Sequence, residues 1–271
     1  MKPMFMRWSV ALLLAAASTL AHALVFAVNE GVTYRVPNEE IRARYAAIAG
    51  DLSKILRQPV TVEPVGAYPV LRRGLADKAY DLAMVHPAHV SIAAMKNAGY
   101  TLVAVTKGYQ DYRASFLVKA DSRLTSLAEL KGGKLGVPDE DSITAWLVRA
   151  SIRDALGDAA QVSYVYTRYQ DAVPFFVENR LTLSGATAAA GVVKDWTARG
   201  GKVLAQSKPV PIKHIIASPN LSAADVDAVR AYLLALDTTD DGRKKLAPTK
   251  WQGFATFDQA ALMAMGVWLG L

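Results

Sequence analysis

Short apolar runs alternate with helix-patterned segments along most of this chain. In the first half, the runs at 24–28, 60–65 and 80–85 are typical of buried strands, and after each one apolar residues recur every three or four positions. We expect Asn38 to cap the first of the helices. Strands that alternate with helices predict mostly parallel sheets covered by helices, because each helix carries the chain back to the starting edge.

Two extended segments interrupt this alternation, a polar one at 108–113 and a proline-containing one at 207–211. We interpret them as hinge crossovers between two lobes. The sequence thus predicts an α/β fold of two lobes, each a mostly parallel sheet covered by helices. Lobe 1 takes in residues 24–110 and returns at 208–271, and lobe 2 takes in residues 111–207.

Several helix starts are predicted from small residues and from capping residues. Small residues follow the apolar run 181–183, and we expect them to begin a helix near Ala186. Ser222 is the expected cap of a helix at 224–236, and Thr256 that of the final helix.

Residues 1–23 have the three parts of a secretory signal peptide. Lys2 and Arg7 supply the positive part and 10–17 the apolar part, and the small-x-small sequence at 21–23 is a cleavage site. No later apolar stretch approaches the roughly 20 residues of a membrane span. The chain has no cysteine, which excludes disulfides, thiolate chemistry and the cysteine-linked lipid anchor. We expect an exported periplasmic protein without a lipid anchor.

Charge and composition are those of an ordinary globular protein. Apolar residues make up 52% and charged residues 20% of the chain. Without the signal peptide, a formal charge of about +5 remains. The basic residues are scattered, so we expect a small anionic ligand and no nucleic-acid partner.

The stretch 134–155 predicts a strand, a polar turn and a helix. Asp141, Ser142 and Thr144 fall where the helix begins. Side-chain oxygens there satisfy free backbone N–H groups, and those N–H groups with the helix dipole also attract anions. From this stretch alone, a simple cap and an anion site are both open.

Several segments, taken in order, resemble one family of proteins. They are Tyr80-Asp81-Leu82-Ala83 followed by a Pro-Ala pair, the glycine-containing stretch 129–136, and Lys208-Pro209-Val210-Pro211. The mature sequence resembles the periplasmic phosphate, phosphite and phosphonate-binding proteins of ABC importers (PhnD-like), which have the type II periplasmic-binding fold.

The resemblance implies a set of ligand-binding residues. Tyr68 matches a tyrosine that lines the cleft from the first lobe, and Tyr112 matches one at the crossover. Ser142 and Thr144 match two hydroxyls of the family's Ser-Thr-Ser-Gly turn, which holds the phosphorus oxyanion.

The departures from the family pattern bear on the ligand. Ile143 and Ala145 replace a threonine and a glycine of that turn, so one hydroxyl is lost. Tyr169 stands where the family often has a histidine that donates to the anion. Ala189 and Lys213 fall near two acids that bind a ligand ammonium, and repulsion from a lysine disfavours an amine there.

The histidines support weaker hypotheses. His86 ends a predicted strand, where a hydrogen bond into the cleft and a structural role are equally expected. His86 and His89 are spaced as a metal pair, but no third ligand accompanies them. We expect His214 to be packed in the interior.

Together these features predict a binding protein that is not an enzyme, needs no cofactor or metal, and acts as a monomer. The resemblance implies that it captures a small oxyanion for an inner-membrane ABC permease. A sensor of the same fold that signals to a membrane protein is the alternative from another class. An exported hydrolase is a third, although Ser142 lacks the Gly-x-Ser-x-Gly turn.

Overall fold

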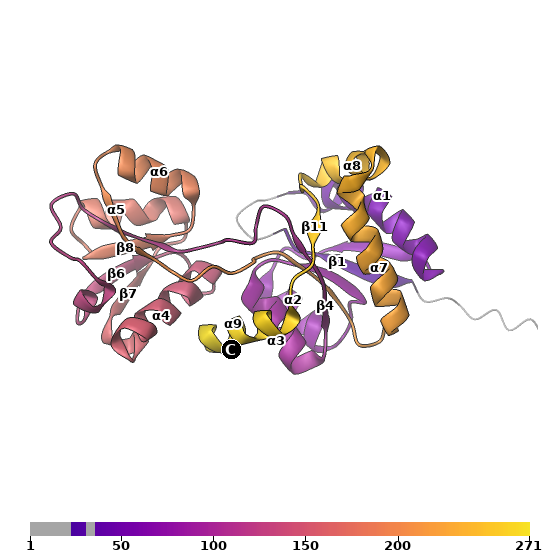
Figure 1. Cartoon of the computed structure of the whole chain (residues 1–271), viewed down its shortest axis with the longest axis horizontal. Helices are drawn as coiled ribbons and strands as arrows, with labels where there is room; N and C mark the ends of the chain where they lie inside the picture. Colours follow the sequence, from indigo (N-terminus) through magenta and orange to yellow (C-terminus); the bar gives the residue numbers. More distant parts are fainter. Residues whose placement is uncertain (1–22, 31–35) are drawn as a thin grey trace, which may run out of the picture.

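The computed structural model describes residues 23–30 and 36–271. The signal peptide predicted at 1–23 lies outside them apart from Ala23. Two lobes lie side by side and are joined by two extended crossovers (Figure 1). No helix of the described part is long and apolar enough to span a membrane.

Lobe 1 is built on a six-stranded sheet with the strand order β11-β4-β10-β3-β1-β2. Helices pack on both of its faces, as in other helix-covered sheets. Its elements are β1 (Leu24–Val28), α1 (Asn38–Leu56), β2 (Val60–Pro64), α2 (Tyr68–Ala76), β3 (Leu82–Val85), α3 (Ala88–Ala98), β4 (Thr101–Thr106), β10 (His214–Ala217), α7 (Ala223–Ala235), α8 (Asp240–Leu246), β11 (Phe254–Ala255) and α9 (Gln259–Leu269).

Lobe 2 is built on a five-stranded sheet with the order β7-β6-β8-β5-β9. Its elements are β5 (Ser115–Val118), β6 (Lys134–Val137), α4 (Ile143–Leu156), β7 (Ser163–Tyr166), α5 (Val173–Glu178), β8 (Ser184–Thr187), α6 (Ala190–Ala198) and β9 (Lys202–Gln206). The two-lobe α/β fold is therefore confirmed. We propose the lobe limits at 110/111 and 207/208, within the two crossovers.

Both sheets are mixed, which refines the expectation of mostly parallel sheets. In lobe 1, β1 to β4 run in one direction, but β10 lies antiparallel between β3 and β4. In lobe 2, β5 lies antiparallel between β8 and β9. The paths of the two crossovers explain the antiparallel strand in lobe 1. One crossover leaves lobe 1 after β4 and the other returns directly into β10, so β4 and β10 run in opposite directions.

Helix α9 packs against both lobes. It contacts α3 of lobe 1 and α4 of lobe 2, and lies below the gap between the lobes in Figure 1. The indole Nε1 of Trp268 donates to a carboxylate oxygen of Asp154 at 2.8 Å. The guanidinium of Arg153 donates to the carbonyl oxygen of Trp268. The last helix thus ties lobe 2 to lobe 1.

Of the three helix caps predicted in lobe 1, one is confirmed and two are wrong. Ser222 caps α7 as expected, accepting from the backbone N–H of Asp225 at 3.1 Å. Asn38 does not cap α1 but is its first residue, after Pro37. The cap of α9 is Asp258, which accepts from the backbone N–H of Ala260 at 2.8 Å, and not Thr256.

The small residues at 184–187 form the buried strand β8, so the helix start predicted near Ala186 is wrong. The strand pairs in parallel with β6. A Cβ atom on Gly185 would lie 2.5 Å from Cγ1 of Val173 on α5. Small side chains are needed here because α5 packs directly on the strand.

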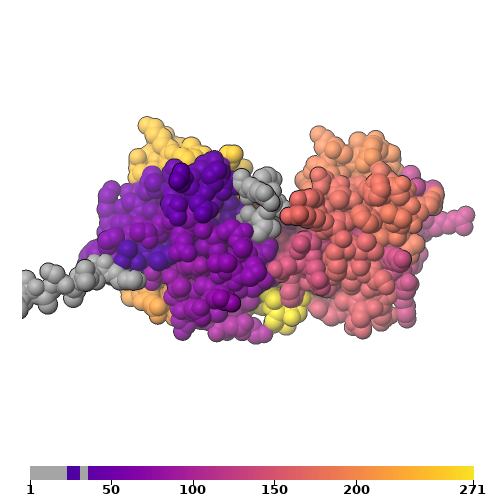
Figure 2. Space-filling view, turned by 180° about the vertical axis from the view of Figure 1, so that it is seen from behind, coloured from indigo at the N-terminus to yellow at the C-terminus, as the bar shows by residue number. Residues whose placement is uncertain are grey.

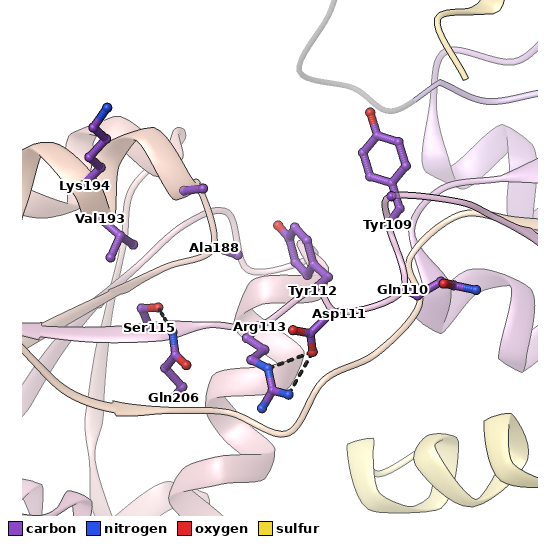
Figure 3. Close-up of a pocket in the computed structure, with 12 residues that line it drawn as sticks. Tyr109, Gln110, Asp111, Tyr112, Arg113, Ser115, Ala188, Val193, Lys194 and Gln206 are labelled. Carbon is purple, nitrogen blue, oxygen red and sulfur yellow. Dashed lines mark hydrogen bonds and ion pairs between the residues drawn. The ribbon is translucent and has the colours of Figure 1, made fainter. Parts of the chain in front are cut away.

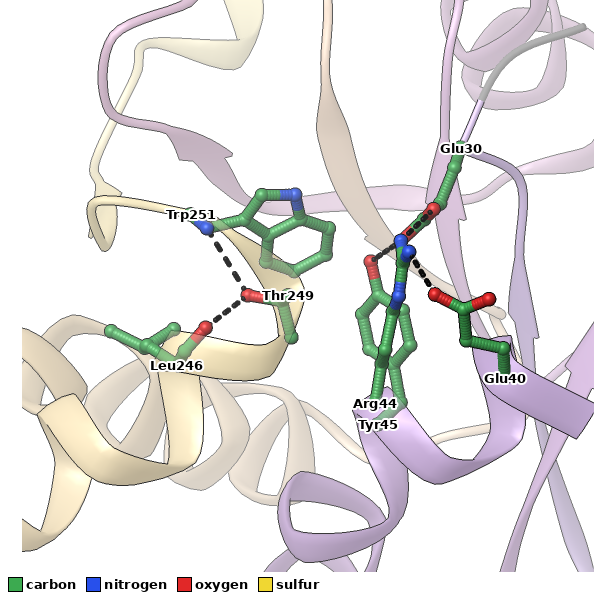
Figure 4. Close-up of polar contacts among 7 residues, drawn as sticks. All are labelled: Glu30, Glu40, Arg44, Tyr45, Leu246, Thr249 and Trp251. Carbon is green, nitrogen blue, oxygen red and sulfur yellow. Dashed lines mark hydrogen bonds and ion pairs between the residues drawn. The ribbon is translucent and has the colours of Figure 1, made fainter. Parts of the chain in front are cut away.

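A polar network fixes the end of β1. Tyr45 of α1 donates to one carboxylate oxygen of Glu30 at 2.8 Å, and Arg44 pairs with the other at 2.9 Å (Figure 4). The Tyr45 ring packs edge-on against Trp251, with ring centroids 5.1 Å apart. Because Glu30 is nearly buried, the pairing compensates for the loss of its hydration.

Candidate functional site

The two crossovers pair with each other where they pass between the lobes. The backbone N–H of Tyr112 donates to the carbonyl oxygen of Val210 at 3.3 Å, and the N–H of Val210 donates back at 3.0 Å. A third bond joins the N–H of Ile212 to the carbonyl oxygen of Tyr109 at 3.1 Å. This short ladder holds the half-buried Tyr112 at the hinge.

The first turn of α4 is built as the sequence predicts. Ser142 is the cap, and its hydroxyl accepts from the backbone N–H of Ala145 at 3.1 Å. Ile143 is only 3% exposed and belongs to the core, while Thr144 is fully buried. The cap and the positive end of the helix dipole lie beside Thr144, whose hydroxyl contacts Tyr112 at the hinge. Because Ile143 has no hydroxyl, this turn carries one hydroxyl fewer than a Ser-Thr-Ser turn.

Four polar side chains meet at the hinge, and we call Tyr112, Thr144, Gln170 and Thr187 the hinge cluster. The hydroxyls of Tyr112 and Thr144 lie 3.1 Å apart. The amide nitrogen of Gln170 donates to Thr144 at 2.8 Å and to Tyr112 at 3.3 Å. Its amide oxygen accepts from Thr187 at 2.8 Å and from the backbone N–H of Ala188 at 2.9 Å. Burial raises the pKa of Tyr112, so its phenol is protonated at neutral pH.

The predicted ligand-binding residues on lobe 1 are Tyr68, His86 and Lys213. Tyr68 is the first residue of α2, and its ring centroid lies 6.0 Å from the guanidinium of Arg72. The Nδ1 atom of His86 lies 3.3 Å from the carbonyl oxygen of Ile212. Burial and the neighbouring Lys213 lower the pKa of His86 to about 4, which makes it a neutral imidazole.

The ammonium of Lys213 lies 3.9 Å from the centroid of the Tyr109 ring. This is a cation–π contact between the returning crossover and the outgoing one. His214, the next residue, is fully buried as expected.

Tyr169 does not join the hinge cluster. It is 51% exposed, and its ring stacks on the guanidinium of Arg168 at 5.5 Å. The side chain that reaches Thr144 belongs to the following residue, Gln170. The sequence carried no signal for this, because a lone glutamine resembles any polar loop residue.

An ion pair joins the two lobes, and the sequence did not predict it. Arg72 of α2 donates to the carboxylate of Asp141, which lies directly before the cap of α4. His89 lies 3.5 Å from the same carboxylate, and its ring stacks on Trp146 with centroids 5.3 Å apart. The hydrogen bond from His89, with the Arg72 guanidinium, lowers the pKa of Asp141. In Figure 2 the lobes are in contact along the lower part of their facing sides.

A pocket of about 700 Å³ opens beside the first crossover (Figure 3). Tyr112 lines it, and its phenol oxygen points toward the side of Ala188. Asp111, the only acid among the described residues that line it, is paired with Arg113 at 2.8 Å. The lining residues are Gly108, Tyr109, Gln110, Asp111, Tyr112, Arg113, Ser115, Ala188, Ala190, Val193, Lys194 and Gln206.

The described residues contain no group of three or more His, Asp or Glu side chains placed to hold a metal ion. His86 and His89 contact different partners, the carbonyl of Ile212 and the carboxylate of Asp141. The pairing of these histidines in a metal site therefore has no support in the geometry.

Two α/β lobes, a pair of hydrogen-bonded crossovers and a polar cluster at the hinge define a two-lobe periplasmic binding protein of type II. Sequence comparison identifies the family. The family described as "ABC transporter, phosphonate, periplasmic substrate-binding protein" matches residues 31–262. The chain belongs to this family, whose members are substrate-binding proteins and not enzymes, so the hydrolase alternative is wrong. No curated protein sequence matches the chain.

Solved structures share the fold at low sequence identity. XAC2383 from Xanthomonas citri bound to ATP is 15% identical with a TM-score of 0.71, over 92% of this chain and 97% of that one. PhnD1 from Prochlorococcus marinus in complex with methylphosphonate is 15% identical with a TM-score of 0.62, over 90% and 96%. A binding-protein component of an ABC phosphonate transporter from Pseudomonas aeruginosa is 18% identical with a TM-score of 0.59, over 90% and 85%.

Proposed function

We propose that this protein captures a small phosphorus oxyanion, such as phosphate, phosphite or a phosphonate, in the periplasm and delivers it to an inner-membrane ABC permease. It reaches the periplasm through a cleaved signal peptide and carries no lipid anchor. Membership of the family supports a small ligand, a permease partner and a periplasmic location.

The observation that carries the choice of ligand is the hinge cluster beside the capped start of α4. Its groups at the hinge are hydroxyls, an amide and backbone N–H groups, and it contains no carboxylate. Hydrogen-bond donors beside a helix N-terminus favour anions, because the helix dipole and the N–H groups act together. Asp111 in the pocket lining and Asp141 before the cap of α4 are both paired with arginines.

Ligand capture then follows from the two-lobe design. Ser142 and backbone N–H groups of lobe 2 hold the anion, and Tyr112 lines the site with the buried Thr144 behind it. Tyr68, His86 and Lys213 approach from lobe 1. Closure about the crossovers brings the two sets together, and a ligand that contacts both lobes stabilises the closed state.

Calorimetric titration of the mature protein tests the proposal. The ligands are phosphate, phosphite, methylphosphonate, aminoethylphosphonate, ATP, sulfate and small carboxylates. We expect a phosphorus oxyanion to bind most tightly. Preferential binding of a carboxylate, or no binding by any phosphorus compound, contradicts the assignment. Uptake of the best ligand by cells that lack this protein, with and without its restoration, tests delivery to the permease.

A further inference from the structure

The orientation of the Gln170 amide is fixed by its neighbours. A backbone N–H can only donate, so the atom that faces the N–H of Ala188 at 2.9 Å must be the amide oxygen. The amide NH₂ group therefore faces Thr144 and Tyr112, at 2.8 and 3.3 Å. An NH₂ group cannot accept, so both hydroxyl oxygens must accept from it.

The remaining partners of Gln170 are also committed. Its oxygen accepts from the hydroxyl of Thr187, which itself accepts from the backbone N–H of Ala189 at 3.2 Å. Both lone pairs of the amide oxygen and both amide hydrogens are thereby used. Gln170 can take no further hydrogen bond without breaking one of these four.

Counting hydrogens leaves one hydroxyl hydrogen without a protein acceptor. Tyr112 and Thr144 carry two such hydrogens, and their mutual 3.1 Å contact uses one. Within residues 23–30 and 36–271, neither hydroxyl has any further partner. Thr144 is fully buried, whereas Tyr112 lines the pocket. Thr144 therefore donates to Tyr112, and the unused hydrogen is that of the phenol.

We propose that Gln170 is a positioning residue that makes the Tyr112 hydroxyl an obligate donor toward the ligand. The inference rests on the proposed function, since it assigns this donor to an oxygen of the bound oxyanion. A site arranged in this way selects for a ligand oxygen that accepts at this point. A group that can only donate, such as an ammonium, placed there would leave two hydrogens facing each other.

The substitution Gln170→Glu reverses the arrangement at almost constant volume. A carboxylate still accepts from Thr187 and Ala188, but it also accepts from the hydroxyls of Thr144 and Tyr112. The phenol hydrogen then turns inward, and the ligand loses its donor. The added charge also repels an anion, so affinity must be compared within a double-mutant cycle.

The cycle combines Gln170→Glu with Tyr112→Phe and measures methylphosphonate affinity. We expect Tyr112→Phe to weaken binding about tenfold in the wild type, as for a hydrogen bond to a charged group, and less than about twofold in the Gln170→Glu background. Equal losses in the two backgrounds overturn the proposal. Tyr166→Phe, which removes a hydroxyl elsewhere in lobe 2, serves as the control and should change affinity in neither background.

A second measurement needs no ligand. The pKa of Tyr112 is followed by NMR of tyrosines labelled at the ring carbon that bears the hydroxyl. In the wild type, the amide hydrogens stabilise the phenolate, whereas a carboxylate opposes it. We expect Gln170→Glu to raise the pKa of Tyr112, and an unchanged or lower pKa overturns the proposal. If no oxyanion binds the wild type, the proposed function fails, and this titration still decides the role of Gln170.

A further variant covers the case in which Gln170→Glu does not fold. Thr144→Val keeps the Gln170 contact to Tyr112 but removes the other hydroxyl. The phenol hydrogen should still face the pocket, so Tyr112→Phe should retain its penalty of about tenfold in this background. If Tyr112→Phe costs affinity only in the Thr144→Val background and not in the wild type, the phenol normally donates to Thr144, and the proposal fails.

Discussion

Arg72 on lobe 1 and Asp141 on lobe 2 form an ion pair that joins the two lobes immediately before the cap of helix α4. The pair places a carboxylate beside the proposed anion site and neutralises it with a guanidinium from the opposite lobe. We therefore expect ligand binding and contact between the lobes to be coupled at this ion pair.

We expect Arg72→Ala to weaken oxyanion binding several-fold, because it leaves the charge of Asp141 uncompensated near the ligand. Stability should fall by less than about 1 kcal/mol, since both side chains are 40% exposed. Calorimetric titration and thermal unfolding measure the two effects.

Arg73→Ala is the matched control, because Arg73 is an exposed residue of the same helix. It should leave affinity unchanged. The double variant Arg72→Ala with Asp141→Asn should recover most of the lost affinity. If it binds as weakly as Arg72→Ala alone, the uncompensated charge is not the cause.

Ser142→Ala should cost about 1 kcal/mol of stability, because it removes the cap of α4. It should also weaken oxyanion binding, since the cap lies at the proposed site. Ser222→Ala removes an equivalent cap on α7, on the outer face of lobe 1. The control should lose similar stability and no affinity. Equal affinity in the two variants argues against a ligand at Ser142.

Lys213 should make the site discriminate against amines. We expect aminoethylphosphonate to bind more weakly than methylphosphonate, because the ammonium of the ligand would meet that of Lys213. Lys213→Asp should narrow the difference between the two affinities. Lys202→Asp, on the exposed edge of β9, is the control and should leave the difference unchanged. Equal affinities in the wild type remove this role for Lys213.

Stability should fall as the pH is lowered from about 6.5 to about 4. Burial lowers the pKa of His214 to about 4, and burial together with Lys213 does the same for His86. In this window the unfolded chain takes up protons that the folded protein excludes, so each group contributes a slope of up to about 1.4 kcal/mol per pH unit.

His214→Gln should flatten this dependence, measured by denaturant unfolding across the window. The amide of glutamine can still bond to Ser91 and to the carbonyl of Pro211, the partners of His214. A slope that persists unchanged in the variant shows that His214 is not excluded from protonation. Below pH 4, the lowered pKa of Asp141 maintains the inter-lobe pair until that carboxyl is protonated.

The sequence by itself determined the two-lobe α/β fold, the approximate crossovers and the capped start of α4. These follow from local patterns, such as apolar periodicity, prolines in extended segments and a hydroxyl before a helix. The resemblance of ordered segments, each weak alone, was enough to reach the family that the comparison confirms.

Only the tertiary structure decided the antiparallel insertion of β10, the hinge cluster and the pairing of Arg72 with Asp141. Each depends on how distant segments meet once the chain has crossed between the lobes. Gln170 and Thr144 are 26 residues apart and touch only because β6 and β7 lie side by side. Periodicity records which face of an element is buried, but it does not record which side chain from another element lies against it.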